Sequence, residues 1–203
     1  MRKDKKKAVL TGAHGLLGIH ASAYLKYILD FDVVRPSRTE WTARGALARQ
    51  IDGADLFLHF AALNRGSDEE VDAVNDHLTA LVVAAIAEVE TPPSAIVYSN
   101  SIHFERDTVY GRMKRRVADA LTEASIARRV RFIDGVLPNV FGEGGQQFSN
   151  SVVSTFCYQL ARGEKPQVLN DGEIELLHAG DAIAALAGSA IEPGERHVVL
   201  RPV

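Results

Sequence analysis

Three glycines spaced three residues apart, directly after a short apolar run, constrain the fold of this chain most. The run is Ala8-Val9-Leu10, and Thr11 leads from it into Gly12, Gly15 and Gly18. In a strand–turn–helix unit, such glycines supply a positive φ, a close approach of the backbone to pyrophosphate, and tight packing of helix on strand. Free N–H groups at the start of the helix favour an anion. The pattern predicts a nucleotide-binding turn, and an ordinary glycine-rich loop is the alternative.

Composition is typical of one globular α/β domain. The chain has 203 residues, 46% of them hydrophobic and 24% charged, and we expect a single domain over 1–203. The net charge of -3 gives no reason to expect nucleic acid, and the basic run at 1–7 is predicted to be a disordered tail. We expect no membrane partner and a cytoplasmic location, because no membrane-length apolar stretch or signal peptide is seen. Cys157, in the apolar run 152–157, is predicted to be a buried small hydrophobe, and no metal-ligand cluster is seen.

The segment 16–34 predicts a helix and a second short strand, which complete a βαβ unit. Arg35, Ser37 and Arg38 follow that strand, with no acidic residue before Glu40. An acid at this place suits the ribose of NAD, whereas Arg suits the 2′-phosphate of NADP. We therefore expect NADP(H) to be preferred over NAD(H); exposed surface arginines are the alternative.

A continuous apolar run at 55–62 predicts a strand buried on both faces of a parallel sheet. Small residues at its carboxyl end leave room for a dinucleotide, and the candidate cofactor contacts there are Phe60, Ala61 and Ala62. His59 is predicted to be a packed residue rather than a catalyst. Asn64 and Arg65 follow in a polar loop and are candidate substrate contacts.

A further strand at 95–98 leads to Ser99, Ser101 and His103, ahead of a helix that starts at Tyr110. Lys114 lies one helical turn after Tyr110 and on the same face, where its ammonium would lower the pKa of the phenol. Ser101 would orient a carbonyl or alcohol, Tyr110 would transfer the proton, and Lys114 would also hold the nicotinamide ribose. Y-x-x-x-K also arises by chance on helix surfaces, but the preceding glycine turn and serine favour the catalytic interpretation.

Together these motifs resemble the extended short-chain dehydrogenase/reductase family, in its nucleotide-sugar epimerase/dehydratase group. The residues that carry the likeness are Thr11-Gly12-x-x-Gly15-x-x-Gly18, His59-x-Ala61-Ala62, Asn75, Ser101 and Tyr110-x-x-x-Lys114. The segments 63–65, 137–142 and 150–158 extend it to the reductase domain of capsular-polysaccharide enzymes that reduce a UDP-2-acetamido-2,6-dideoxy-hexos-4-ulose. The resemblance implies a Rossmann-like, doubly wound parallel sheet with a minimal C-terminal substrate lobe at about 139–203.

The predicted site has three groups of residues. The catalytic group is Ser101, Tyr110, Lys114 and Asn75. The cofactor group is Gly12, His14, Gly15, Leu16, Leu17, Arg35, Ser37, Arg38, Phe60, Ala61, Ala62, Ser99, Tyr110, Lys114, Pro138, Asn139 and Val140. The substrate group is Asn64, Arg65, His103, Asn139 and His178, although a packed role for His178 and a turn role for Asn139 are alternatives.

The chain departs from the family pattern near the catalytic serine. Asn100 and His103 stand where relatives have Ser and Gln, and Val136 stands where they have Arg. Dehydration is disfavoured, because no acid pair follows Ser101. Asp181 is predicted to be the N-cap of a helix at 182–191, with a last strand at 197–203. Relatives continue beyond this point, so we expect a partner or second subunit to complete the pocket, or a substrate smaller than a nucleotide sugar.

The function predicted from the sequence is NADPH-dependent reduction of a keto group on a nucleotide sugar or sugar-like substrate, by a homodimeric enzyme. One alternative is an epimerase that retains NAD(P). The other is a non-catalytic NAD(P)-binding interaction module.

Overall fold

A six-stranded parallel sheet forms the centre of the protein, in the order β2-β1-β3-β4-β5-β8. The computed structural model describes residues 5–43, 45–149, 151–168 and 172–201. The strands are β1 (Lys7–Thr11), β2 (Asp32–Val34), β3 (Leu56–His59), β4 (Ala95–Ser101), β5 (Arg131–Leu137) and β8 (His197–Leu200). The predicted doubly wound parallel sheet is confirmed.

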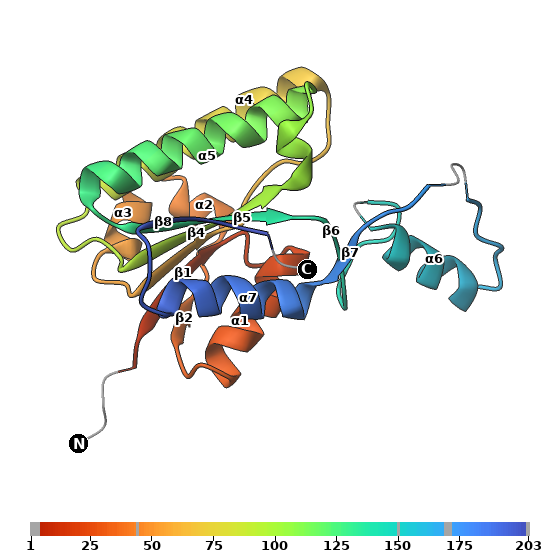
Figure 1. The fold of residues 1–203 in the computed structure, drawn as a ribbon, viewed down its shortest axis with the longest axis horizontal. Coiled ribbons are helices and arrows are strands. Elements are labelled where there is room, and N and C mark those ends of the chain that lie inside the picture. Colours follow the sequence, from red (N-terminus) through yellow and green to blue (C-terminus); the bar gives the residue numbers. More distant parts are fainter. Residues whose placement is uncertain (1–4, 44, 150, 169–171, 202–203) are drawn as a thin grey trace.

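Helices cover both faces of this sheet (Figure 1). One face carries α3 (Ala46–Ile51), α4 (Asp68–Glu88) and α5 (Val109–Arg128), and the other carries α1 (Leu16–Tyr27) and α7 (Ala179–Ile191). In β3, Phe57 packs in the core on the α4 and α5 side, whereas Leu58 packs in the core on the α1 and α7 side. Successive side chains of a strand point to opposite faces, which explains why Leu56, Phe57 and Leu58 are all apolar.

Local capping fixes where the two long helices start. Ser67 accepts a hydrogen bond from the backbone N–H of Glu70 at the start of α4, and the Glu70 carboxylate accepts one from the Ser67 N–H. Thr108 accepts from the N–H of Gly111 at 3.1 Å and caps α5. The cap places Tyr110 in the first turn of α5.

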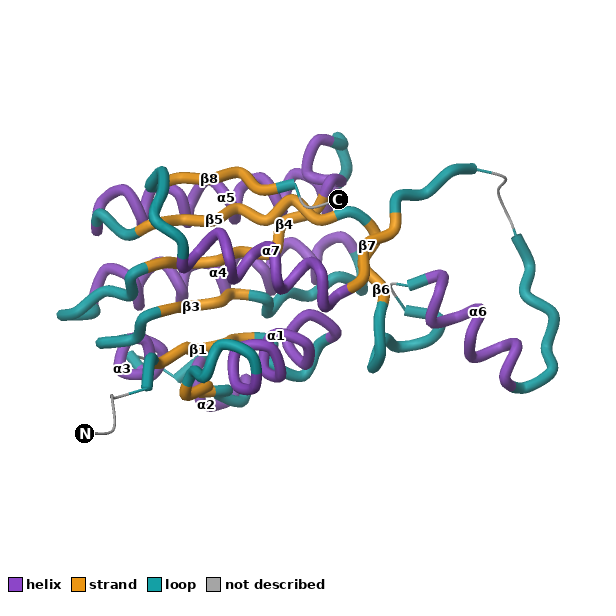
Figure 2. Tube along the Cα trace, turned by 60° about the horizontal axis from the view of Figure 1, so that its bottom comes forward, coloured by secondary structure: helices purple, strands orange, loops and turns teal. Residues whose placement is uncertain are grey.

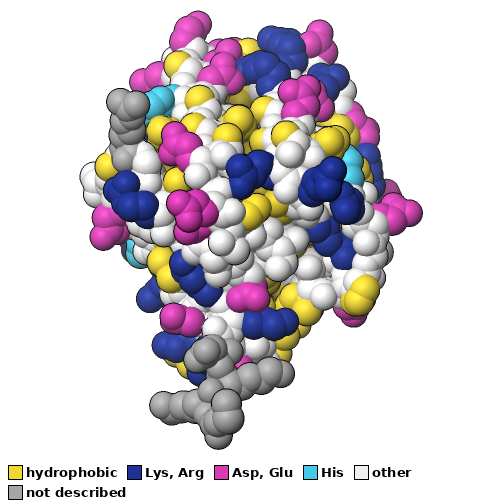
Figure 3. Space-filling view, turned by 90° about the vertical axis from the view of Figure 1, so that its left-hand side faces the viewer, with side chains coloured by type: hydrophobic (Ala, Val, Ile, Leu, Met, Phe, Trp, Pro, Cys, Tyr) yellow, Lys and Arg dark blue, Asp and Glu magenta, His cyan; other side chains and the backbone are white. Residues whose placement is uncertain are grey.

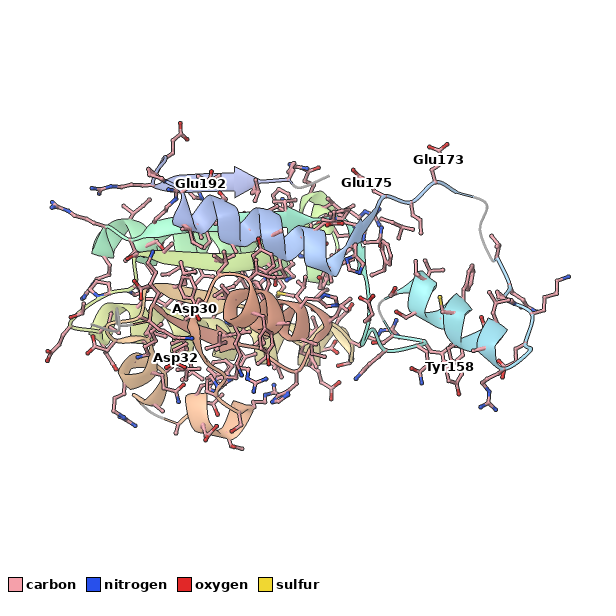
Figure 4. All side chains as sticks on the ribbon, turned by 90° about the horizontal axis from the view of Figure 1, so that it is seen from below. Asp30, Asp32, Tyr158, Glu173, Glu175 and Glu192 are labelled. Carbon is pink, nitrogen blue, oxygen red and sulfur yellow. The ribbon has the colours of Figure 1, made fainter. Side chains whose placement is uncertain are left out.

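A small lobe extends from the carboxyl ends of the strands (Figure 2). It consists of β6 (Asn139–Phe141), α6 (Val152–Ala161) and β7 (Leu176–His178), and β6 pairs with β7 in a separate parallel sheet. We call 5–137 together with 179–200 the body and 139–178 the lobe. Figure 4 shows α6, with Tyr158, set apart from the helices of the body.

The structure differs from the sequence predictions at several places. Lys7 belongs to β1 rather than to a disordered tail, and its N–H donates to Asp55 at 2.8 Å. Residues 1–4 of that predicted tail, and 202–203 of the predicted last strand, lie outside the described residues. The predicted burial of Cys157 was wrong, because α6 stands off the core and Cys157 is exposed.

The helix predicted to follow residue 181 also begins earlier. Asp181 lies in the first turn of α7, and His178 is the N-cap, with its ring accepting from the N–H of Gly180 at 3.2 Å. Between β2 and β3 the chain forms two short helices, α2 (Arg38–Trp41) and α3.

The exposed end of the body opposite the lobe carries Lys, Arg, Asp and Glu side chains interspersed with one another (Figure 3). Such mixing of both signs is typical of a solvated surface. Within the described ranges, no helix combines the length and the apolar character needed to cross a membrane.

Candidate active site

The glycine turn packs as the sequence predicts. Gly12 has a φ of +76°, and a Cβ there would lie 2.6 Å from the backbone N of Ala61. A Cβ on Gly18 would lie 2.1 Å from the carbonyl oxygen of Gly12. Neither position can carry a side chain, because backbone atoms occupy that space. The turn therefore brings α1 directly against the carboxyl ends of β1 and β3.

Gly15, unlike Gly12 and Gly18, has free space around its Cα. It is the N-cap of α1, no side chain caps the helix, and no acidic residue lies in the first turn. A Cβ on Gly15 would meet only the carbonyl oxygen of Gly12, at 3.5 Å. The helix start is therefore open, and its N–H groups and dipole fit a pyrophosphate.

A single large cavity of about 1790 Å³ runs from this turn along the carboxyl ends of the strands to α6. Nineteen of the predicted site residues line it: Gly12, His14, Gly15, Leu16, Leu17, Arg38, Phe60, Ala61, Ala62, Asn64, Arg65, Ser99, Ser101, His103, Tyr110, Lys114, Pro138, Asn139 and Val140. Its size suits a dinucleotide and a second ligand together. The predicted residues that do not line it are Arg35, Ser37, Asn75 and His178.

The segment after β2 places one arginine at the cavity. Arg38 lines it, whereas Arg35 is exposed elsewhere. Ser37 caps α2 in a capping box: its hydroxyl accepts from the N–H of Glu40, and the Glu40 carboxylate accepts from the Ser37 N–H at 2.7 Å. These hydrogen bonds hold the pKa of Glu40 below its usual value. The S-x-x-E pattern was the sequence signal for this role.

Ser101, Tyr110 and Lys114 meet beside the carboxyl end of β4. Ser101 ends that strand, and its hydroxyl accepts from the N–H of His103 at 3.2 Å. Lys114 lies one turn after Tyr110 in α5, with its Nζ 5.8 Å from the centre of the tyrosine ring. The ammonium donates to the carbonyl oxygen of Ser99 at 2.7 Å. The three catalytic candidates thus share one wall of the cavity.

Burial dominates the electrostatics of this group. It lowers the pKa of Lys114 to about 8, and it raises the pKa of Tyr110, against a hydrogen bond with Ser101. The net pKa of Tyr110 is raised, because removal of the phenol from water outweighs the influences that lower it in the free protein.

Asn75 is a positioning residue. Its side chain is buried, and its amide oxygen accepts from the N–H of Leu63 at 2.9 Å. Its Nδ2 donates to the carbonyl oxygens of Leu63 and Val71, at 2.8 and 2.7 Å. The amide therefore fixes the loop that presents Asn64 to the cavity.

Two further histidines are held by protein groups. His59 is buried, its Nδ1 is 2.8 Å from the hydroxyl oxygen of Thr11, and burial lowers its pKa to about 3. The structure thus shows the packed role predicted for it. His178 lies outside the cavity lining, with its Nε2 3.1 Å from the carboxylate of Glu143. These contacts agree better with a packed role for His178 than with contact to a substrate.

His103 lines the cavity beside Ser101. Its Nδ1 is buried and has no hydrogen-bond partner among the described residues. Burial and the nearby Arg106 lower its pKa, so the imidazole is neutral at pH 7. A neutral ring can both donate and accept a hydrogen bond, which suits a sugar hydroxyl.

Sequence reasoning missed the contribution of α6. One side of this helix lines the cavity with Val152, Val153, Thr155, Phe156 and Gln159. Their spacing is helical, and that was the available signal. An apolar run of this kind predicts a buried face but cannot distinguish a protein core from the wall of an open cavity.

Comparison with known proteins agrees with this architecture. A match to the family described as "NAD dependent epimerase/dehydratase family" covers residues 8–193. A UDP-2-acetamido-2,6-beta-L-arabino-hexul-4-ose reductase of Pseudomonas aeruginosa is 32% identical over 87% of this chain and 47% of its own length.

Solved structures give the same result. The capsular polysaccharide assembling protein CapF of Staphylococcus aureus matches with a TM-score of 0.74 and 27% identity, over 95% of this chain and 52% of its own. A UDP-glucose 4-epimerase of Thermotoga maritima matches in fold with a TM-score of 0.81 and 14% identity, over 96% of this chain and 76% of its own. The chain spans about half the length of the reductase and of CapF. The predicted resemblance is confirmed: the chain belongs to the NAD dependent epimerase/dehydratase family.

Proposed function

We propose that this protein reduces a keto group on a nucleotide sugar or a sugar-like substrate, with NADPH as the reductant. The observation that carries the proposal is that Ser101, Tyr110 and Lys114 line the same cavity as the open start of α1. The reductase relative, which is named for a UDP-keto-sugar substrate, supports the same reaction class.

The residues of the glycine turn fit a dinucleotide. The start of α1 would hold the pyrophosphate, and Ala61 and Ala62 would lie along it. When bound, NADPH supplies a hydride to the carbonyl carbon and leaves as NADP⁺. Pro138, Asn139 and Val140 would contact the nicotinamide or the substrate from the opposite side of the cavity.

The chain's own groups handle the carbonyl oxygen. The hydroxyl of Ser101 donates a hydrogen bond to it, and Tyr110 delivers the proton that completes the alcohol. The raised pKa of Tyr110 keeps the phenol protonated at neutral pH, as a proton donor must be. Lys114 supplies a cation behind the phenol and stabilises the phenolate left after transfer.

Arg38 and the capping box support the preference for NADPH. Arg38 lines the cavity where a 2′-phosphate would lie. The nearby carboxylate of Glu40 is held by the backbone of Ser37 and does not compete for a ribose hydroxyl.

The substrate would bind between the body and α6. Asn64, Arg65 and His103 line the body side of this part of the cavity, and Phe156 and Gln159 line the lobe side. We also propose that the protein forms a homodimer. Light scattering on the purified protein measures its mass and tests this.

The first experiment is a fluorescence titration with NADPH and with NADH, followed by NADPH consumption with a panel of 4-keto nucleotide sugars. We expect micromolar binding of NADPH, weaker binding of NADH, and turnover with at least one keto sugar. Cofactor that copurifies and interconverts sugars without net oxidation would favour the epimerase. Failure of both nucleotides to bind would favour an interaction module.

A further inference from the structure

A buried pair of polar side chains links β5 to the catalytic serine. Asp134 and Asn100 are 6% and 3% exposed, and the Asn100 Nδ2 donates to the Asp134 carboxylate at 3.1 Å. The amide oxygen of Asn100 accepts from the N–H of Ser101 at 2.9 Å. A buried amide that is satisfied on both sides has one orientation, so Asn100 fixes the backbone of Ser101 relative to Asp134.

The same layer holds Lys114. Tyr98 pairs in register with Asp134, and the Nζ of Lys114 lies 4.9 Å from the centre of the Tyr98 ring. Tyr98, Asn100 and Asp134 all face α5, because residues two apart on a strand share a face and paired residues point the same way. Among the described residues, the second carboxylate oxygen of Asp134, Oδ1, has no hydrogen-bond partner. A buried carboxylate with free capacity thus lies in the same layer as a buried ammonium.

We propose that Asp134 and Asn100 are positioning residues for the reaction proposed above: the carboxylate maintains the positive charge of Lys114, and the amide holds the backbone of Ser101. The inference rests on the proposed function for its catalytic part. Its electrostatic part concerns the free protein and can be tested without substrate.

Charge interactions in this layer agree with the proposal. Burial lowers the pKa of Lys114, and the Asp134 carboxylate opposes that change. Burial raises the pKa of Asp134, and Asn100 and Lys114 oppose that rise. Other titratable groups also face Asp134 and Lys114. They are His59 of β3, Tyr98 of β4, Tyr110 and Asp119 of α5, and His197 of β8. Of these, His59 and both tyrosines are neutral at pH 7, and Asp119 is exposed to water, so Asp134 is the buried carboxylate placed to act on Lys114.

The direct test is a pH titration of the lysine side chains by NMR in the protein without cofactor, with Lys114→Arg used to assign the Lys114 signal. In Asp134→Asn, loss of the negative charge should lower the pKa of Lys114 by about one unit or more. The matched control is Asp119→Asn, which removes an exposed carboxylate of α5 and should leave that pKa unchanged. An unchanged Lys114 pKa in folded Asp134→Asn would overturn the electrostatic part.

Asn100→Ala separates the two roles, because it keeps the Asp134 charge and removes both hydrogen bonds. We expect the Lys114 pKa to stay near the wild-type value, kcat to fall about tenfold, and KM to change little. A variant with lower thermal stability and wild-type kcat would show a purely structural role and overturn the positioning part.

The two proposals fail differently. If the wild-type protein turns over no keto sugar, the proposed function is contradicted, but the charge interaction between Asp134 and Lys114 is not. The Lys114 titration in Asp134→Asn decides the charge pair in either case.

Discussion

The body and the lobe of this protein are stabilised in different ways. The body packs two apolar cores against the sheet, and residues such as Phe57, Leu58 and Ile133 are fully buried. The lobe presents α6 without one buried residue, and Phe148 and Leu160 are 56% and 63% exposed. The catalytic candidates and most of the cofactor-binding candidates lie in the body, whereas α6, on the lobe side of the substrate cavity, has no buried residue. Segments with few buried contacts are those that open and close most easily.

Both polar and apolar contacts join the two regions. The Arg65 guanidinium donates to the carbonyl oxygen of Phe148 at 2.9 Å, and Val140 and Leu177 of the lobe pack in the apolar core on the α1 and α7 side. Within the lobe, Asn139 donates to the carbonyl oxygen of Glu175 at 3.2 Å, and Figure 4 shows Glu175 on the irregular segment that returns from α6 toward the body.

The largest contrast should come from exchanging a tyrosine in each region. Tyr110→Phe removes the proposed proton donor and should lower kcat by about a hundredfold to ten-thousandfold, with unchanged NADPH affinity. Tyr158→Phe, on α6, removes a hydroxyl outside the cavity lining and should leave kcat near wild type. Steady-state kinetics and NADPH titration measure both. Equal kcat values for the two variants would contradict the assignment of Tyr110.

Acid should destabilise the body through His59. Its pKa in the folded protein is about 3, against 6.5 as the ordinary value, because the ring is buried. Below pH 6.5 the unfolded chain therefore takes up a proton that the folded chain does not, so stability falls as the pH drops toward 3. The loss should reach about 4 kcal/mol at the acid end.

Urea unfolding at a series of pH values tests this, with His59→Gln as the comparison. The variant should lack the part of the acid slope that begins near pH 6.5. Wild type and variant with parallel pH profiles would show that His59 is not the group responsible.

The cofactor preference should depend on one arginine of the pair. Arg38→Ala should weaken NADPH binding about tenfold and leave NADH binding unchanged, because Arg38 lines the cavity. Arg35→Ala is the matched control and should change neither affinity. A larger effect for Arg35 would mean that the segment after β2 rearranges when the cofactor binds.

Prediction from sequence succeeded where a local pattern has one structural consequence. Gly12 and Gly18 have no room for a side chain, and the spacing of Tyr110 and Lys114 fixes them on one helical face. It leaves a choice open where one pattern has two uses. Ser37 could contact a phosphate or cap a helix, and only the position of Glu40 decides between them.

The wrong prediction for Cys157 has a similar cause, which here concerns a whole helix rather than one side chain. The apolar run 152–157 has helical spacing whether its partner is a protein core or a cavity. Only the tertiary structure distinguishes these two partners, and in this protein one side of the helix lines the cavity while Cys157 is exposed.

The smallest expected effect concerns the link between lobe and body at Glu143. Its carboxylate lies 3.1 Å from the Nε2 of His178 within the lobe and 3.7 Å from the Nε2 of His20 in α1 of the body. Hydrogen bonds lower the pKa of Glu143 in the folded protein, so its contribution to stability is complete above about pH 4.5 and is lost as the pH falls through the lowered value. Glu143→Gln should therefore lower the melting temperature slightly at pH 5 to 6, and by less and less as the pH falls below 4.5. Because the carboxylate is exposed, a large change at any pH would mean that the lobe is held to the body more firmly than its contacts indicate.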